Sequence, residues 1–221
     1  MLQMEEELVC IDDALLAETQ ARINRVFTND LLFPVYVIQE PSERKESIMA
    51  VCGGASSHFY RDKISDWQGP GYVIMVYRDE MSRPDFYGSI LHEIAHCCQA
   101  TMPPPWACLP EEIGLFPVPK ENLRPVSGTP YDNYKVHQPD FWRLALHAWA
   151  RGVDAGFPCD VHHLGQTLVD SDLMFETIKP EIEQLAEYPL WKIGKRPVPR
   201  TFAKVFDIDL DILIANSKSQ P

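Results

Sequence analysis

The chain has 221 residues, enough to bury the core of one large domain or of one domain with an extension. Its apolar content of 45% is ordinary for a globular protein, and no apolar run approaches the roughly 18 residues of a membrane span. The net charge of −12 argues against nonspecific binding of nucleic acid by the whole surface. The acidic N-terminus lacks the features of a signal peptide, so we expect a cytoplasmic protein without a membrane partner.

The six cysteines do not indicate a disulfide framework. They include no Cys-x-x-Cys pair, which argues against a zinc ribbon. Cys97 and Cys98 directly follow a histidine, but free cysteines are usually small buried residues. We therefore expect both to pack in the core of the protein.

The first hundred residues predict a helix, three strands and a second helix, in that order. Apolar residues recur at helical spacing over 11–27, and runs rich in β-branched and aromatic residues predict strands at 33–38, 47–52 and 72–77. Gly53-Gly54 is expected to end the second strand. Ser82 has the features of a helix N-cap, with proline in the first turn and Asp85 near the positive end of the helix dipole. This order predicts an α+β fold, with a small mixed sheet carrying helices on one side.

The second half of the chain is less regular. Residues 103–131 hold eight of the nineteen prolines, and this long connection is either a cover over a site or a spacer. Helices are predicted at 139–151 and 175–188, where Pro180 should kink or split the second one. We expect residues 1–152 to form one domain and residues 153–221 to form a helical C-terminal extension packed on it.

The segment His92-Glu93-Ile94-Ala95-His96 carries the strongest functional signal in the sequence. On a helix, residues i and i+4 lie on one face, so two imidazoles can share one metal ion. A glutamate next to the first histidine then lies beside a metal-bound water and can act as a general base. This pattern is the signature of zincin metallopeptidases, with His92 and His96 as ligands of a catalytic zinc and Glu93 as the base.

A catalytic zinc site needs a third protein ligand. A metzincin would have glycine and histidine where Gln99 and Met102 stand, so that class is excluded. Glu111 or Glu112 would serve in a gluzincin, and Asp132 is close to the position used in an aspzincin. The remaining candidate is His137, just before a predicted helix that contains Phe141 and Trp142.

His92-Glu93-x-x-His96 followed by His137-x-x-x-Phe141-Trp142 resembles the SprT-like (Spartan-type) metalloprotease domain over residues 11–150. In that family the third histidine lies in a His-Gly-x-x-Phe/Trp context, and this chain has Gln138 in place of the glycine. The resemblance implies a zincin-like fold, one zinc ion, His137 as third ligand and a protein or peptide substrate. It also implies that an edge strand before the motif helix pairs with the substrate, which points to Tyr72, Val73 and Ile74.

Tyr131 and Tyr134 lie near His137 in the sequence and are candidate donors to the developing oxyanion. Two rival functions remain open. One is a non-haem iron oxygenase or hydroxylase that uses His92, His96 and a carboxylate, because the motif helix also resembles that of elongation-factor-P hydroxylases. The other is a non-catalytic metal-binding interaction module.

Overall fold

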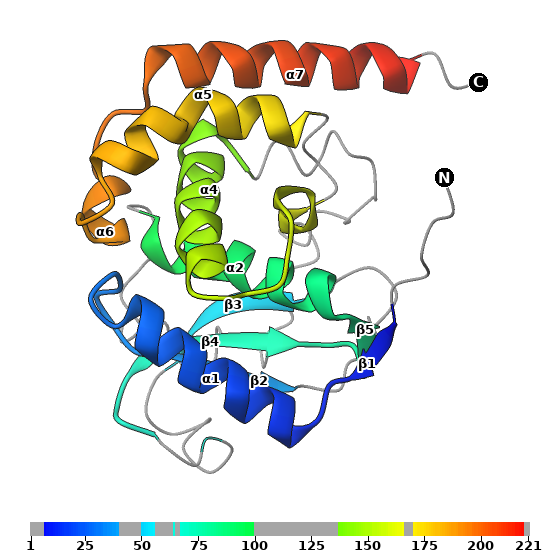
Figure 1. Ribbon diagram of the computed structural model, residues 1–221, viewed down its shortest axis with the longest axis vertical. Coiled ribbons are helices and arrows are strands. Elements are labelled where there is room, and N and C mark those ends of the chain that lie inside the picture. The colour runs from blue at the N-terminus through cyan, green and yellow to red at the C-terminus, as the bar shows by residue number, and fades with distance from the viewer. Residues whose placement is uncertain are drawn as a thin grey trace, which may run out of the picture.

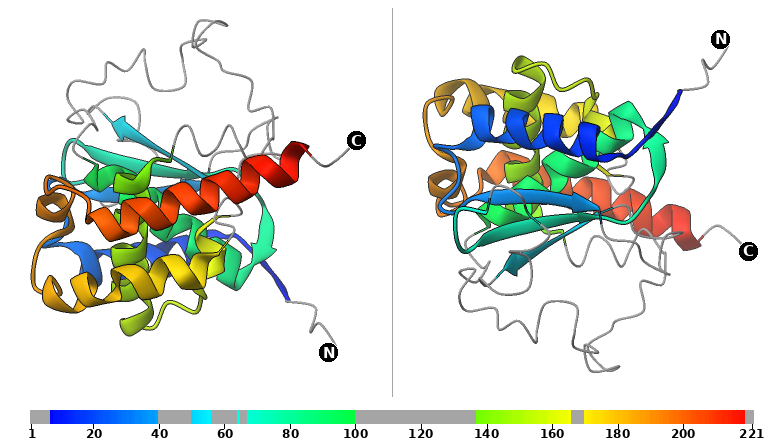
Figure 2. Two further views of the ribbon diagram at one scale, coloured as in Figure 1. Left: turned by 90° about the horizontal axis from the view of Figure 1, so that it is seen from above. Right: turned by 90° about the horizontal axis from the view of Figure 1, so that it is seen from below.

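A mixed α+β fold is formed by the residues that the computed structural model describes, which are 7–39, 50–55, 64, 67–99, 137–165 and 170–218. A three-stranded sheet carries α1 and α2 on one face, and the remaining helices stack beyond them (Figures 1 and 2). Strands β1 and β5 form a separate two-stranded sheet. The predicted α+β class is therefore confirmed. Within the described ranges, no helix combines the length and the apolar character needed to cross a membrane.

The three-stranded sheet is mixed, as predicted. It consists of β2 (Val35–Gln39), β3 (Ala50–Ala55) and β4 (Gly71–Val76), in the order β2-β4-β3. β2 runs parallel to β4, and β3 runs antiparallel to it. β4 is thus the central strand, and its side chains are buried on both faces of the sheet.

Two details of the strands differ from the prediction. β3 continues through Gly53-Gly54, which we expected to end it, because both glycines pair with β4 in the ladder; residues 47–49 of the predicted strand lie outside the described residues. The short strands β1 (Leu8–Cys10) and β5 (Glu80–Ser82) pair antiparallel and were not predicted. Three residues are too few for an alternating pattern to be recognised in the sequence.

The second helix begins at its predicted cap, and the first begins two residues later than predicted. Asp12 caps α1 (Asp13–Phe27), since its carboxylate accepts a hydrogen bond from the Leu15 N–H at 2.8 Å. Ser82 caps α2 (Arg83–Cys98), since its hydroxyl oxygen accepts from the Asp85 N–H at 3.2 Å. These caps satisfy backbone donors that the first turn of a helix leaves unpaired. The motif helix is therefore fixed at its N-terminal end.

The second half of the described chain is helical, with a short 3-10 turn between two long helices. Its elements are α4 (Pro139–Asp154), the turn η2 (Val161–Leu164), α5 (Ser171–Gln184), α6 (Leu190–Ile193) and α7 (Arg200–Lys218). Pro180 does not split the helix as one form of the prediction had it, because α5 continues through this proline. Met174 and Ile178 are buried before Pro180, and Glu181 is bonded to Arg143 after it, so α5 is anchored on both sides.

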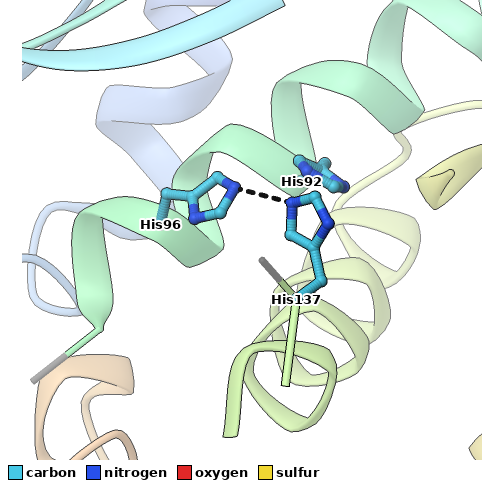
Figure 3. A group of neighbouring side chains, drawn as sticks. All are labelled: His92, His96 and His137. Carbon is cyan, nitrogen blue, oxygen red and sulfur yellow. Dashed lines mark hydrogen bonds between the residues drawn. The ribbon is translucent and has the colours of Figure 1, made fainter. Parts of the chain in front are cut away.

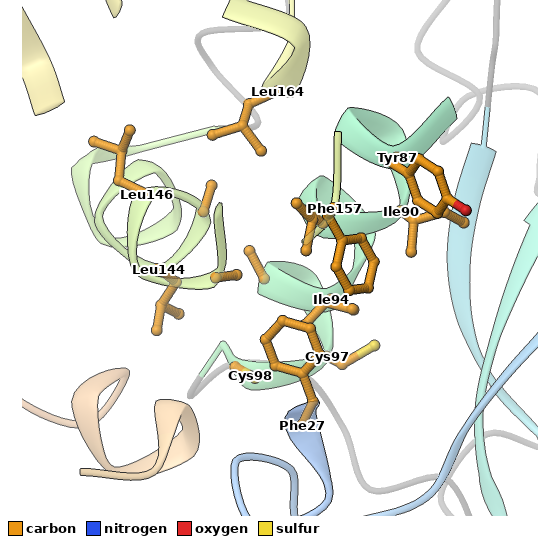
Figure 4. Close-up of a cluster of buried hydrophobic side chains, with 14 of the residues drawn as sticks. Phe27, Tyr87, Ile90, Ile94, Cys97, Cys98, Leu144, Leu146, Phe157 and Leu164 are labelled. Atoms are coloured by element: carbon orange, nitrogen blue, oxygen red, sulfur yellow. The ribbon is translucent and has the colours of Figure 1, made fainter. Parts of the chain in front are cut away.

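The core is built around α2 (Figure 4). Ile90 and Ile94 of this helix are fully buried and belong to the same cluster as Phe27 of α1, Leu144 of α4 and Phe157 after α4. Cys97 and Cys98 are buried in this cluster, which confirms the sequence interpretation. The domain boundary expected after residue 152 falls inside α4, and the chain that follows contributes Val161 and Leu164 to the same core.

Candidate metal centre

Three histidines, two on α2 and one just before α4, converge at one place (Figure 3). His92 and His96 lie one turn apart on α2, with ring centroids 5.1 Å apart. The ring of His137, just before α4, lies 4.8 Å from that of His92 and 5.2 Å from that of His96. One nitrogen from each ring lies within 4.8 Å of the other two. The structure thus brings together the three residues predicted as metal ligands.

His137 is placed by the packing of α4 against α2. Phe141 and Trp142, in the first turn of α4, are fully buried. The ring of Phe141 lies 4.6 Å from His92, 4.3 Å from His96 and 4.5 Å from His137, measured between centroids. This aromatic ring forms a common apolar wall for the three imidazoles. The burial of Phe141 therefore holds the start of α4, and with it His137, beside the motif helix.

The hydrogen bonds of two of these rings leave a nitrogen lone pair for a metal. Nδ1 of His92 lies 2.7 Å from the carbonyl oxygen of Leu164. A carbonyl can only accept, so Nδ1 of His92 carries the proton and Nε2 carries the lone pair. Nδ1 of His96 lies 2.9 Å from the side-chain oxygen of Gln99, which gives the same assignment. Metal-binding histidines have this pattern, in which the other ring nitrogen donates to a carbonyl.

Burial keeps these imidazoles in the neutral form that binds metals. It lowers the pKa of His92 well below its usual value, with further lowering by His96 and His137, while the bond to Leu164 opposes the change. Burial also lowers the pKa of His96, against the opposing bond from Gln99. Both rings are therefore neutral near pH 7. A metal ion could therefore bind either ring without first removing a proton from an imidazolium.

The geometry of the donors fits a tetrahedral ion. Two nitrogens that each lie 2.0–2.1 Å from a tetrahedral zinc are about 3.3 Å apart. The Nε2 atoms of His96 and His137 are 3.2 Å apart. Neutral imidazoles suit zinc, and also copper, nickel and iron. The donor set and its spacing thus fit the predicted zinc.

Glu93 flanks the histidine pair on α2. One residue adds 100° of rotation on an α-helix, so Glu93 lies about 100° from His92 and about 60° from His96 around the helix axis. Only 7% of its surface is exposed. A carboxylate in this position can accept and release a proton next to the converging imidazoles.

The strand assignment for the substrate was wrong. Tyr72, Val73 and Ile74 lie in β4, which pairs with β2 on one side and with β3 on the other. Their exposed fractions are 3% or less, so they cannot receive an added peptide strand. The assignment was wrong because chain order differs from sheet order. β4 is the last of this sheet's three strands before the motif helix, but it lies in the centre of the sheet, between β2 and β3.

Several other predicted site residues lie outside the described residues. They are the alternative third ligands Glu111, Glu112 and Asp132 and the two candidate oxyanion donors Tyr131 and Tyr134. The Pro-rich connection over 103–131 lies outside them too. Among the candidates that the structure does describe, His137 is the one placed beside His92 and His96.

Two hydrogen-bond partners of the site were missed in the sequence. Gln99 accepts a hydrogen bond from His96, and we considered it only as a residue that excludes a metzincin. Its position three residues after His96, at the helix end, could have indicated this contact. The carbonyl of Leu164 gives no such signal, because every residue has a backbone carbonyl. It lies 72 positions from His92 in the chain.

A second group of possible metal donors lies on η2. Asp160, His162 and His163 have donor atoms within 4.8 Å of one another. Nδ1 of His163, however, lies 3.0 Å from the backbone N–H of Asp160 and caps this turn. A structural role therefore accounts for His163.

Comparisons with known proteins add no family to this description. No protein-family model matches the chain, and neither a curated protein nor a solved structure matches it. The resemblance to the SprT-like domain therefore rests on the residues of the site.

Proposed function

We propose that this protein is a zinc-dependent metallopeptidase of the zincin type. His92, His96 and His137 would hold one zinc ion, and Glu93 would act as the general base. The observation that carries the proposal is the convergence of two histidines of α2 with the histidine just before α4, the first two with a lone pair at Nε2. A glutamate beside such a group is needed for catalysis but not for a purely structural metal site.

The composition of the donor group favours zinc over the iron rival. A non-haem iron oxygenase would use two histidines and one carboxylate. In the described part of the chain, the group around His92 and His96 is completed by His137 and contains no carboxylate. Three protein ligands leave one tetrahedral position open, as in catalytic zinc sites.

In the proposed reaction, the zinc ion and the residues of the chain have separate roles. When bound, zinc lowers the pKa of a water molecule toward neutrality and polarises the scissile carbonyl. The carboxylate of Glu93 accepts a proton from the attacking water as the new C–O bond forms. It then gives a proton to the amine nitrogen as the C–N bond breaks. The ring of Phe141 makes one side of the site apolar.

The substrate class that fits this site is an extended peptide or an unfolded protein segment. β3 packs against the motif helix and is an outer strand of the sheet in the described residues. An extended substrate can add to an outer strand through backbone hydrogen bonds. We therefore assign to β3 the role that the sequence suggested for β4.

The test compares the wild-type protein with Glu93→Gln after both are loaded with one equivalent of zinc. We expect both to retain zinc, measured by elemental analysis, and only the wild type to cleave a quenched fluorescent peptide library. Glu176→Gln, a change on the exposed surface of α5, controls for a Glu→Gln substitution away from the site and should remain active. Equal cleavage by wild type and Glu93→Gln would remove Glu93 from the mechanism. Iron as the metal of anaerobically purified protein, with no cleavage by the zinc form, would favour the oxygenase instead.

A further inference from the structure

We infer that the turn η2 is a positioning element of the metal centre, which holds His92 in its metal-binding form through the carbonyl of Leu164. Gly88 and Gly165 are the residues that allow this contact. The inference rests on the proposed metal site, but it concerns metal affinity and ring geometry rather than peptide cleavage. It assigns a role to a segment that the sequence placed in a separate extension.

The contact between η2 and His92 is short and shielded from water. Nδ1 of His92 lies 2.7 Å from the oxygen of Leu164, and Leu164 is 1% exposed. A hydrogen bond is stronger in such a low-dielectric environment than at the surface. The bond fixes the proton on Nδ1 and the orientation of the ring. It therefore leaves Nε2 of His92 for a metal shared with His96 and His137.

Gly88 lets η2 approach α2 at this place. It lies one helical turn before His92, on the same face of α2. A Cβ atom at residue 88 would lie 2.2 Å from the backbone oxygen of His163 and 2.6 Å from its carbonyl carbon. Glycine weakens the interior of a helix, so the close approach of the η2 backbone gives it a positive role here. Any side chain at residue 88 would push η2 away from His92.

Gly165 ends η2 directly after Leu164. Its φ of +153° is disfavoured for residues with a side chain. A Cβ atom there would also lie 3.2 Å from the ring of Trp142 and 3.6 Å from Nδ1 of His92. The contact with Trp142 is tight and that with His92 is an ordinary van der Waals contact, so glycine at residue 165 lets the chain leave the site without displacing Trp142. Both glycines act on His92 through the C-terminal part of the same turn, Gly88 by contact with His163 and Gly165 directly after Leu164.

His92 and His96 differ in this respect. The partner of His96 is Gln99, three residues away on the same helix end, whereas the partner of His92 comes from a segment beyond α4. The orientation of His96 is set locally, and that of His92 depends on the docking of η2. Metal affinity should consequently respond to changes at the η2 contact.

The experiment measures zinc affinity in Gly88→Ala, by competition with a chromophoric chelator. We expect the dissociation constant to rise about 10-fold to 100-fold, as for loss of other partners of metal-binding histidines. In the metal-free protein, the ¹⁵N NMR signals of His92 should change from one fixed tautomer to an average of both. The NMR measurement needs neither zinc nor peptidase activity. The role of η2 can therefore be tested even if the protein proves not to be a peptidase.

Gly71→Ala is the matched control. A Cβ atom at residue 71 would lie 2.5 Å from the backbone oxygen of Pro34, a comparable clash in the sheet that does not involve η2. This variant should lose stability but keep the wild-type zinc affinity and the fixed His92 tautomer. Should Gly88→Ala fail to fold, Gly165→Ala tests the same contact. Wild-type affinity and an unchanged tautomer in the folded variant would overturn the inference.

Discussion

The Nε2 atoms of His96 and His137 lie 3.2 Å apart, although 41 positions separate the two residues in the chain. Nδ1 of His96 is bonded to the oxygen of Gln99, so Nε2 of His96 is an acceptor. In the metal-free protein, Nε2 of His137 must then donate to it. This pair is already at the spacing of two zinc ligands, so a metal would replace one hydrogen bond without moving the backbone.

His137→Ala should weaken zinc binding more than the roughly 10-fold to 100-fold that loss of an outer partner costs, because a direct ligand is removed. Zinc affinity can be measured by chelator competition. Glu176→Gln, a change on the exposed surface of α5 away from both histidine groups, is the control and should bind zinc as the wild type does. If His137→Ala keeps full affinity, the third ligand must come from the other candidates, Glu111, Glu112 or Asp132.

Gln99→Ala should lower zinc affinity about 10-fold, because His96 loses the acceptor that fixes its tautomer. Gln99→Glu, which retains an acceptor oxygen, should largely preserve binding. Gln184→Ala, a change at the exposed end of α5, serves as the control. An affinity of Gln99→Ala equal to that of the control would show that His96 is oriented by packing against Phe141 alone.

Local patterns in the sequence predicted the parts of the fold that local physics determines. Ser82 and Asp85 marked the start of α2, and both take part in its cap. The spacing of His92 and His96 placed them on one face of a helix. The order of the sheet, by contrast, depends on which strand packs outside another. Nothing within 47–52 or 72–77 encodes that order, so the outer strand was misassigned.

The candidate site shows the same division. Side-chain identity pointed to His137, since a histidine before an aromatic pair on a helix is a specific pattern. The role of Leu164 depends on a backbone oxygen brought from η2 to α2 by the packing of Gly88. A glycine in the sequence can indicate that another part of the backbone packs closely against it, but not which segment of the chain does so. Such contacts become visible only in three dimensions.

Glu181→Gln should destabilise the protein by about 3 kcal/mol, because it breaks a buried ion pair and leaves one charge without its partner. Nε of Arg143 donates to Glu181 at 2.7 Å, and the side chain of Arg143 is only 3% exposed. The pair joins α4, which follows His137, to α5. Urea unfolding of the metal-free protein measures the loss.

The control for this change lies on the same helix. Glu176 forms an exposed pair with Lys179 at 3.8 Å, and Glu176→Gln should cost less than about 1 kcal/mol. Equal losses in Glu176→Gln and Glu181→Gln would mean that the buried pair contributes no more than a surface one.

The free energy of unfolding should fall as the pH drops below 6.5, because of the buried side chain of His147. Burial lowers the pKa of His147 below its ordinary value of 6.5, reinforced by the charges of Arg151 and Arg143 and opposed by Glu181. As the pH falls through 6.5, the unfolded chain binds a proton that the folded protein does not, so unfolding is favoured. The stabilisation that comes from the lowered pKa of His147 is fully present above pH 6.5. It decreases by at most about 1.4 kcal/mol per pH unit below it.

His147→Gln tests this dependence, because glutamine can donate to Glu181 but does not titrate. The free energy of unfolding of the metal-free protein is measured in urea at pH 8.0, 6.5 and 5.5 for both proteins. His92 and His96 contribute with the same sign in both, since their pKa values are also lowered, and they cancel in the comparison. The variant should lose less stability than the wild type between pH 6.5 and 5.5, whatever its stability at pH 8.0. Parallel losses in the two proteins would mean that His147 takes up its proton equally well in the folded state.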